Sequence, residues 1–413
     1  MVIKTNILPR LLYLFLSLPI QIPDCQFREW DRAISRFIWN GKAPRIRFKT
    51  LQLPRCSGGM GLPCLKDYYI AAQIRPAILW CNNDYTAKWK AIELSQSNKP
   101  LQSLLGNPVT AKHNIQNHLI KPTINTWLDI VKKFNLQNEI CVLRWPAHDL
   151  DFEQAPMDRS FIQWEKQGIT MICLLIDNLE LIDFKTVCER YTLNCQDFYR
   201  YLQLHHYYTK DIKGSLKGNI STLTQMFIKA YKSKLNKKII GGLYRNINEL
   251  RGHSTSYIKE KWEKELDIII THEDWAIKID TQNTTTNSQV WRDFSWKNSV
   301  SYFITPIQKS KQTDLPPACC WECGYSYIFW SCPVLKYFWE GIHSSVKEIL
   351  GYNIEFTCLS FYLGSIDPSL SKICQLNDGL LHLHQQIFGS YSGYGKYSDH
   401  FKFFSLCFIA AIC

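Results

Sequence analysis

The segment between residues 24 and 38 constrains the fold most, because it has the periodicity of an amphipathic helix. Apolar side chains recur there at spacings of three and four, which places them on one face of a helix. They are Phe27, Trp30, Ile34, Phe37 and Ile38. Asp24 follows Pro23 and is expected to cap the start. The pattern predicts a helix over residues 24–38.

A second stripe of the same helix is basic. Arg28, Arg32 and Arg36 lie four residues apart and therefore share one face. Residues 41–44 (Gly-Lys-Ala-Pro) are expected to end the helix, and further cations lie within this segment and directly after it. They are Lys42, Arg45, Arg47 and Lys49. The last three alternate with apolar residues, which predicts a strand-like segment over residues 45–49.

These adjacent basic elements indicate contact with nucleic-acid phosphates, since phosphate neutralisation by Lys and Arg dominates such binding. The alternative is a solvated charged face, because Glu29 and Asp31 lie nearby. The net charge of the 413-residue chain is +12, and residues 1–100 hold 15 Lys/Arg against 6 Asp/Glu. That excess favours an anionic partner.

A second basic stretch lies between residues 210 and 251, with ten Lys/Arg against two acidic residues. Lys234, Lys237 and Lys238 follow an apolar run there and form a second candidate phosphate surface, with an exposed lysine face as the alternative. The glycine-rich motif at residues 58–61 lacks the Gly-Lys-Ser/Thr ending of a phosphate loop, so we expect a turn. The polar stretch at residues 82–107 predicts a linker or long connection.

The 16 cysteines are too sparse for a small disulfide scaffold, and they indicate a reduced, intracellular protein. We expect it in the nucleus or the cytoplasm. The apolar run at residues 11–18 is similar to a signal peptide, but prolines and a basic segment replace its cleavage site. No apolar run is long enough to predict a transmembrane helix.

One cysteine cluster has metal-ligand spacing. Cys320, Cys323 and Cys332 supply three thiols, whereas a structural zinc needs four ligands, and no histidine lies between Cys323 and Cys332. Buried or free thiols are therefore the favoured interpretation. We expect no cofactor, with zinc at these three cysteines as the alternative.

Catalytic patterns are missing from the sequence. A polymerase or nuclease needs clustered carboxylates that hold two metal ions about 4 Å apart, and no paired aspartates occur in an apolar strand context. Neither a Gly-x-Ser-x-Gly elbow nor a His-Glu-x-x-His motif is present. We expect no catalytic residues and no enzymatic activity.

An ordered series of motifs points to a family. Near the N-terminus they are Ile7-Leu8-Pro9-Arg10, Phe27-Arg28-Glu29-Trp30, Arg36-Phe37-Ile38-Trp39, Lys42-Ala43-Pro44-Arg45 and Gly58-Gly59-Met60-Gly61-Leu62-Pro63. Downstream they are Asp197-Phe198-Tyr199-Arg200-Tyr201-Leu202, Lys261-Trp262-Glu263 and Cys320-Trp321-Glu322-Cys323. Over residues 1–366 the chain resembles the region after the reverse transcriptase palm in the second open reading frame of vertebrate LINE-type (non-LTR) retrotransposons.

The resemblance implies a helical thumb, a largely helical connector and a cysteine-rich module that contacts RNA. We therefore predict a mainly α fold with minor β structure, divided into four parts. They are a thumb-like basic helical domain (1–95), a helical connector (96–290), a Cys-containing module (291–370) and a divergent tail (371–413).

By this resemblance the basic stripe faces the template and primer backbone, and the partner is RNA or an RNA/DNA duplex in a retroelement ribonucleoprotein, with no membrane. The palm and the endonuclease are absent from the sequence, and Tyr327 stands where the family has a histidine. The alternative is an inactive, translated retroelement remnant.

Overall fold

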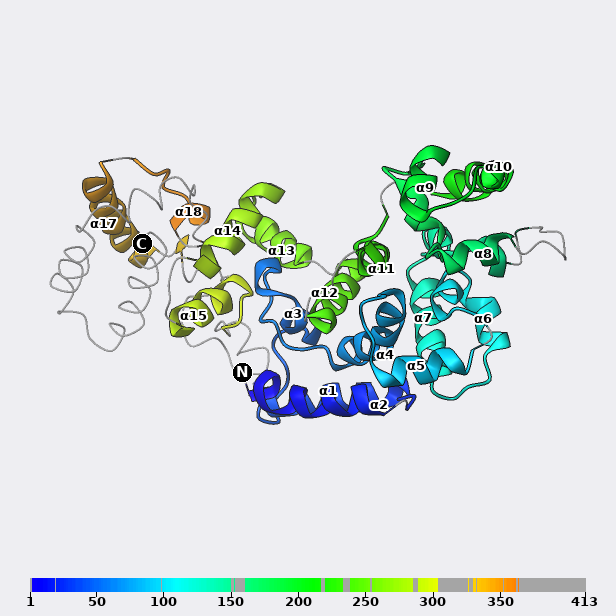
Figure 1. Ribbon diagram of the computed structural model, residues 1–413. Coiled ribbons are helices and arrows are strands. Elements are labelled where there is room, and N and C mark those ends of the chain that lie inside the picture. The colour runs from blue at the N-terminus through cyan, green and yellow to red at the C-terminus, as the bar shows by residue number, and fades with distance from the viewer. Residues whose placement is uncertain are drawn as a thin grey trace. The chain divides into compact units, whose positions relative to one another are not determined.

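A computed structural model describes the chain at residues 2–18, 20–97, 99–149, 152, 160–216, 220–232, 238–252, 255–284, 289–303, 326, 330–331, 333–351, 353–361 and 363. Within these residues the chain is mainly helical (Figure 1), which confirms the predicted fold class. The described strands, β1 (Ile176–Asp177) and β2 (Glu180–Leu181), form one antiparallel pair.

Packing divides the chain into two compact units. The first comprises Met1–Arg32 and Pro63–His253, and the second comprises Ala33–Leu62 and Ser254–Cys413. The predicted domain boundaries at residues 95, 290 and 370 stay predictions. None of the helices described is both long enough and apolar enough to cross a membrane.

The first unit is built from helices, and several of their connections contain 3₁₀ segments or the β1–β2 pair. The α-helices described are α1 (Leu8–Ser17), the first part of α2 (Asp24–Ile38), α4 (Leu65–Cys81), α5 (Lys88–Ser95), α6 (Pro108–Asn114), α7 (Lys121–Lys133), α8 (Ser160–Lys166), α9 (Phe184–Tyr191), α10 (Phe198–Tyr207), α11 (Thr222–Lys232) and α12 (Ile239–Arg251). Helix α4 packs against α1, α7, α11 and α12 (Figure 1). Its apolar residues are spread around its whole circumference, as expected of a helix covered on all sides.

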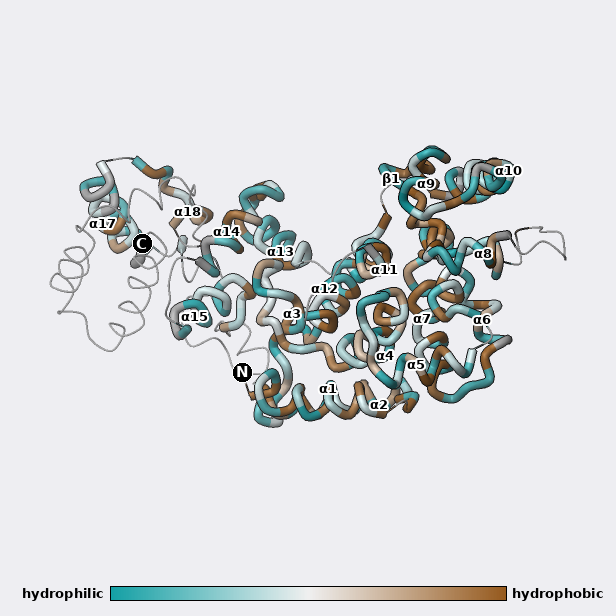
Figure 2. The backbone as a smooth tube through the Cα atoms, viewed as in Figure 1, coloured by the Kyte–Doolittle hydropathy of each residue, from teal (hydrophilic) through white to brown (hydrophobic). Residues whose placement is uncertain are grey.

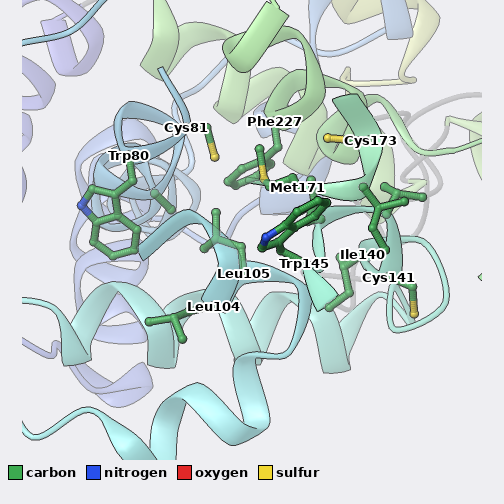
Figure 3. Close-up of a cluster of buried hydrophobic side chains, with 14 of the residues drawn as sticks. Trp80, Cys81, Leu104, Leu105, Ile140, Cys141, Trp145, Met171, Cys173 and Phe227 are labelled. Atoms are coloured by element: carbon green, nitrogen blue, oxygen red, sulfur yellow. The ribbon is translucent and has the colours of Figure 1, made fainter. Parts of the chain in front are cut away.

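A large aromatic core fills this unit. Figure 3 shows Trp145, Met171 and Phe227 close together, and all three side chains are buried. The indole of the buried Trp127 donates a hydrogen bond to the Leu105 carbonyl at 2.9 Å. Buried indole nitrogens need such partners, since an unpaired buried donor is costly.

Of the two interpretations of residues 82–107, the linker is wrong, and the stretch is a packed connection between α4 and α6. Leu101 and Leu105 are fully buried in the core, and the side-chain amide of Asn82 donates to the Ala230 carbonyl at 2.8 Å. Helix α5 forms within the stretch. A few buried leucines are enough to anchor the segment, so its polar average composition conceals a packed structure.

The second unit contains the end of α2 and several further helices. Those described are α3 (Phe48–Gln52), α13 (Ser256–Leu266), α14 (His272–Thr284), α15 (Gln289–Ser299), α17 (Pro333–Leu350) and α18 (Cys358–Phe361). Its buried side chains form small clusters. One is centred on Trp262 and Trp275, and another on Ile46, Leu51 and Trp296.

The glycine motif in this unit is a turn, as predicted. Gly58 has a left-handed φ of 81°, and a Cβ added at Gly59 would lie 2.1 Å from the Leu53 carbonyl oxygen, so only glycine fits there. The amides of Gly58, Gly59 and Gly61 donate to carbonyls of residues 53–55. They are therefore not directed at a phosphate.

Candidate nucleic-acid interface

Helix α2 begins at Asp24 and ends at Ile38, the bounds that its periodicity predicts. Phe27 and Ile34 are buried. The Phe27 ring meets the Trp30 ring edge to face, with centroids 5.3 Å apart, and lies 5.3 Å from the ring of Tyr69 in α4. These contacts fix which side of α2 faces its neighbours.

The last turn of α2 departs from the prediction. Phe37 is 66% exposed and Ile38 is 38% exposed, although the spacing assigns both to the apolar face. The reason is that periodicity specifies which side chains share a face, but a face is buried only where another element covers it.

The first turn of α2 is held by an ion pair. The Asp24 carboxylate lies 2.7 Å from the Lys66 ammonium of α4, and the hydrogen bond from Lys66 lowers the pKa of Asp24. An acidic residue in the first turn also interacts favourably with the helix dipole.

The basic stripe of α2 lies on its exposed side. Arg28, Arg32 and Arg36 are all exposed, and each step of four residues turns the stripe by only about 40° and advances it by about 6 Å. Among the described residues no carboxylate lies within ion-pair distance of these guanidinium groups. Hydrophilic and hydrophobic segments alternate along α2 (Figure 2).

The two acidic residues next to the stripe have other surroundings. Glu29 accepts a hydrogen bond from the Gln26 amide at 3.2 Å. Asp31 is half-buried, and burial raises the pKa of its carboxyl, with the Asp67 carboxylate raising it further. Neither carboxylate neutralises an arginine of the stripe through an ion pair, which weakens the interpretation of a self-compensated surface.

The prediction of a strand-like segment at residues 45–49 is wrong. Arg45 and Ile46 form bends, and α3 begins at Phe48. A strand needs a neighbour for its backbone hydrogen bonds, and the Thr50 amide donates instead to the Arg47 carbonyl at 2.9 Å. The alternation of exposure still holds, with Ile46 buried between two exposed arginines.

The cations after α2 are all exposed, and two of them lie over aromatic rings. Lys42, Arg45, Arg47 and Lys49 are the residues concerned. The Arg45 guanidinium carbon lies 5.0 Å from the centroid of the Tyr302 ring, and that of Arg47 lies 4.3 Å from the Tyr257 ring. Both distances suit cation–π attraction.

Sequence spacing provides no sign of these two tyrosines. Each is separated from its arginine by more than 200 residues, and no spacing or charge pattern connects either tyrosine with residues 45–47. Only the packing of the second unit brings them to the basic loop. Residues 24–49 alone therefore reveal the cations but not the rings that orient two of them.

Other predicted site residues are placed only in part. Lys238 is exposed at the start of α12, whereas Lys234 and Lys237 lie outside the described residues. Cys320, Cys323 and Cys332 also lie outside them. In the described portion of the chain no three potential metal ligands gather at one point.

No protein-family model matches the chain.

Proposed function

We propose that this chain is a non-catalytic nucleic-acid-binding fragment of a LINE-type reverse transcriptase, which contacts the backbone phosphates of RNA or an RNA/DNA duplex. One observation carries the proposal. The guanidinium groups of Arg28, Arg32 and Arg36 are exposed on one face of α2, and none forms an ion pair with a described carboxylate.

Physical chemistry connects that surface to a polyanion. An exposed arginine without a carboxylate partner keeps its donors for a phosphate, and its guanidinium matches phosphate geometry through two parallel hydrogen bonds. Each phosphate neutralised releases condensed counterions, so affinity falls steeply with salt. Contacts of this kind position the nucleic acid without reading its sequence.

The test compares the full chain with a variant lacking the stripe, Arg28→Gln/Arg32→Gln/Arg36→Gln. Anisotropy of a fluorescein-labelled RNA/DNA duplex of mixed sequence gives the affinity between about 50 and 200 mM salt. The variant should bind at least tenfold more weakly at low salt. The slope of log affinity against log salt should become shallower by about 0.9 for each phosphate that the variant no longer neutralises.

The matched control removes three exposed lysines of the first unit, as Lys132→Gln/Lys185→Gln/Lys210→Gln. It has the same net charge as the stripe variant, so it measures the effect of charge alone. Equal decreases of affinity in both variants, or wild-type binding that does not change with salt, would contradict the proposal.

A second candidate, an inactive retroelement remnant, is supported by exposed apolar side chains. Tyr13 of α1 is 70% exposed, Leu14 is 46% exposed and Phe37 of α2 is 66% exposed. Such surface favours association or degradation when nothing covers it. Light scattering separates the candidates, because a monodisperse chain that binds the duplex supports the first and an aggregate without binding supports the second.

The same proposal covers activity, cofactor and location. We expect no nucleotide incorporation with magnesium, no required cofactor, and a place in the nucleus or cytoplasm within a retroelement ribonucleoprotein. The sequence supports this through its lack of paired aspartates in an apolar strand context and its basic N-terminal region. Incorporation of a labelled nucleotide by the purified chain would overturn the non-catalytic part.

A further inference from the structure

The second unit presents two exposed arginines that differ from those of α2. Arg45 lies over the Tyr302 ring and Arg47 over the Tyr257 ring, at 5.0 and 4.3 Å from the ring centroids. Ile46 between them is buried, which anchors the backbone. Within the described part of the chain neither guanidinium has a carboxylate at ion-pair distance.

Both rings are themselves fixed. The Tyr257 hydroxyl and the hydroxyl of the buried Thr50 lie 2.6 Å apart in a hydrogen bond. The Tyr302 ring stacks on Trp39, with centroids 6.0 Å apart and planes inclined by 19°. A ring held in this way restricts the side chain of the arginine above it.

This restriction matters because a mobile arginine loses rotamer freedom when it binds a ligand. The loss opposes binding by about 0.5–1.5 kcal/mol for each long side chain ordered at an interface. An arginine already ordered over a ring has given up part of that freedom before the ligand arrives. Its N–H donors remain able to bind an acceptor, since the ring face takes up the cation without using them as conventional hydrogen bonds.

The geometry also selects among nucleic-acid contacts. Free aromatic faces are the platforms on which bases stack. The Tyr302 ring, however, has Trp39 stacked on it and Arg45 over it. The Lys297 ammonium also lies 5.4 Å from the centroid of this ring. The Tyr257 ring is covered by Arg47. These rings therefore suit the role of supports for cations, and the group that a guanidinium fork then fits is a phosphodiester.

We infer that Tyr257 and Tyr302 are positioning residues, which hold Arg47 and Arg45 ready for the backbone phosphates of RNA or an RNA/DNA duplex. This inference rests on the proposed function. It adds a distinction between two kinds of basic surface: the α2 stripe, with three unconstrained arginines, and the stacked pair, Arg45 and Arg47 over their tyrosines.

The experiment separates the charge from its support. Tyr257→Leu and Tyr302→Leu keep every cation, so the salt slope should stay unchanged while affinity for the labelled RNA/DNA duplex falls about two- to fivefold for each substitution. Arg45→Gln and Arg47→Gln should each make the slope shallower by about 0.9 and also lower the affinity. Circular dichroism of each variant verifies that the helical content is retained.

Tyr257→Phe is the conservative control. It keeps the ring under Arg47 but removes the hydroxyl that ties this ring to Thr50, so its affinity should fall by less than that of Tyr257→Leu. Leucine variants that bind like wild type, or a Phe variant whose affinity falls as much as that of Tyr257→Leu, would overturn the inference.

The outcomes also distinguish this inference from the proposed function. If the leucine variants match wild type while the arginine variants have shallower slopes, the proposed function stands and the positioning role falls. Wild-type binding without salt dependence removes both. A change in preference between poly-uridine and poly-adenosine in Tyr257→Leu would indicate base stacking and also contradict the positioning role.

Discussion

In the first unit the buried Asp67 carboxylate pairs with Arg251, whereas in the second unit the buried Lys278 ammonium donates to the amide oxygen of Gln282 at 2.9 Å. Lys278 also lies 4.9 Å from the Trp275 ring centroid. Burial raises the pKa of Asp67 and Arg251 opposes that rise. Burial lowers the pKa of Lys278 to about 7.

On the surface the contrast is reversed, because there it is cations of the second unit that have partners. Among the described residues the exposed arginines Arg28 and Arg32, which belong to the first unit, lie over no ring and have no carboxylate at ion-pair distance, while Arg45 and Arg47 of the second lie over tyrosines. A cation in this protein is thus stabilised by an anion, an amide, a ring or water. How it is stabilised affects how much free energy of binding it can contribute to an anionic ligand. Three predictions test this contrast.

The largest effect is expected at the buried pair of the first unit. Arg251→Met leaves the Asp67 carboxylate buried without its cation, and breaking a buried pair from one side costs about 3–5 kcal/mol in the free energy of unfolding. Urea unfolding of the full chain, monitored by tryptophan fluorescence, measures the decrease.

Asp67→Asn/Arg251→Met is the control, because it removes both charges and should recover most of the stability. A single variant as stable as wild type would show that the ion pair contributes nothing to the first unit.

The buried lysine of the second unit should respond in the opposite direction. Because the pKa of Lys278 is lowered from 10.5 to about 7, the unfolded chain binds the extra proton more readily between these values. The buried charge of Lys278 therefore lowers the free energy of unfolding by its full amount below about pH 7. This effect disappears as the pH rises above about 10.5. Lys278→Met should raise the free energy of unfolding by about 3 kcal/mol near pH 6, since each pKa unit is worth about 1.4 kcal/mol and the bond to Gln282 is removed.

Repeating the urea titration near pH 10 should show a much smaller difference between Lys278→Met and wild type. A gain of the same size at both pH values would mean that packing alone, and no buried charge, explains the effect. Lys297→Met, a half-buried lysine already paired with Asp293 at 2.7 Å, is the matched control.

The smallest effect compares one arginine from each basic surface. Arg32→Gln removes an unconstrained cation and Arg47→Gln removes one that is ordered over Tyr257. Both should make the salt slope of duplex binding shallower by about 0.9. Arg47→Gln should lower the affinity about twofold more, because the ordered side chain gives up less rotamer freedom on binding. The reverse order in fluorescence anisotropy would show that the ring gives no advantage.

Helix α2 illustrates what local pattern predicts. Its bounds and the separation of its basic and apolar stripes follow from residue spacing, since a helix turns about 100° for each residue whatever surrounds it. Phe37 and Ile38 mark the limit, because exposure depends on whether another element covers a face. Residues 45–49 mark a second limit, because a strand exists only with a partner strand.

The sequence alone determined the mainly helical class, the amphipathic α2 and the cations of residues 24–49, because short-range spacing and charge are properties of neighbouring residues. Only the tertiary structure decided that Arg45 lies over Tyr302, that Arg47 lies over Tyr257 and that Lys278 is buried without a carboxylate partner among the described residues. The two cation–ring contacts join segments far apart in the chain, and packing of the whole unit fixes them, with no local signal in either segment.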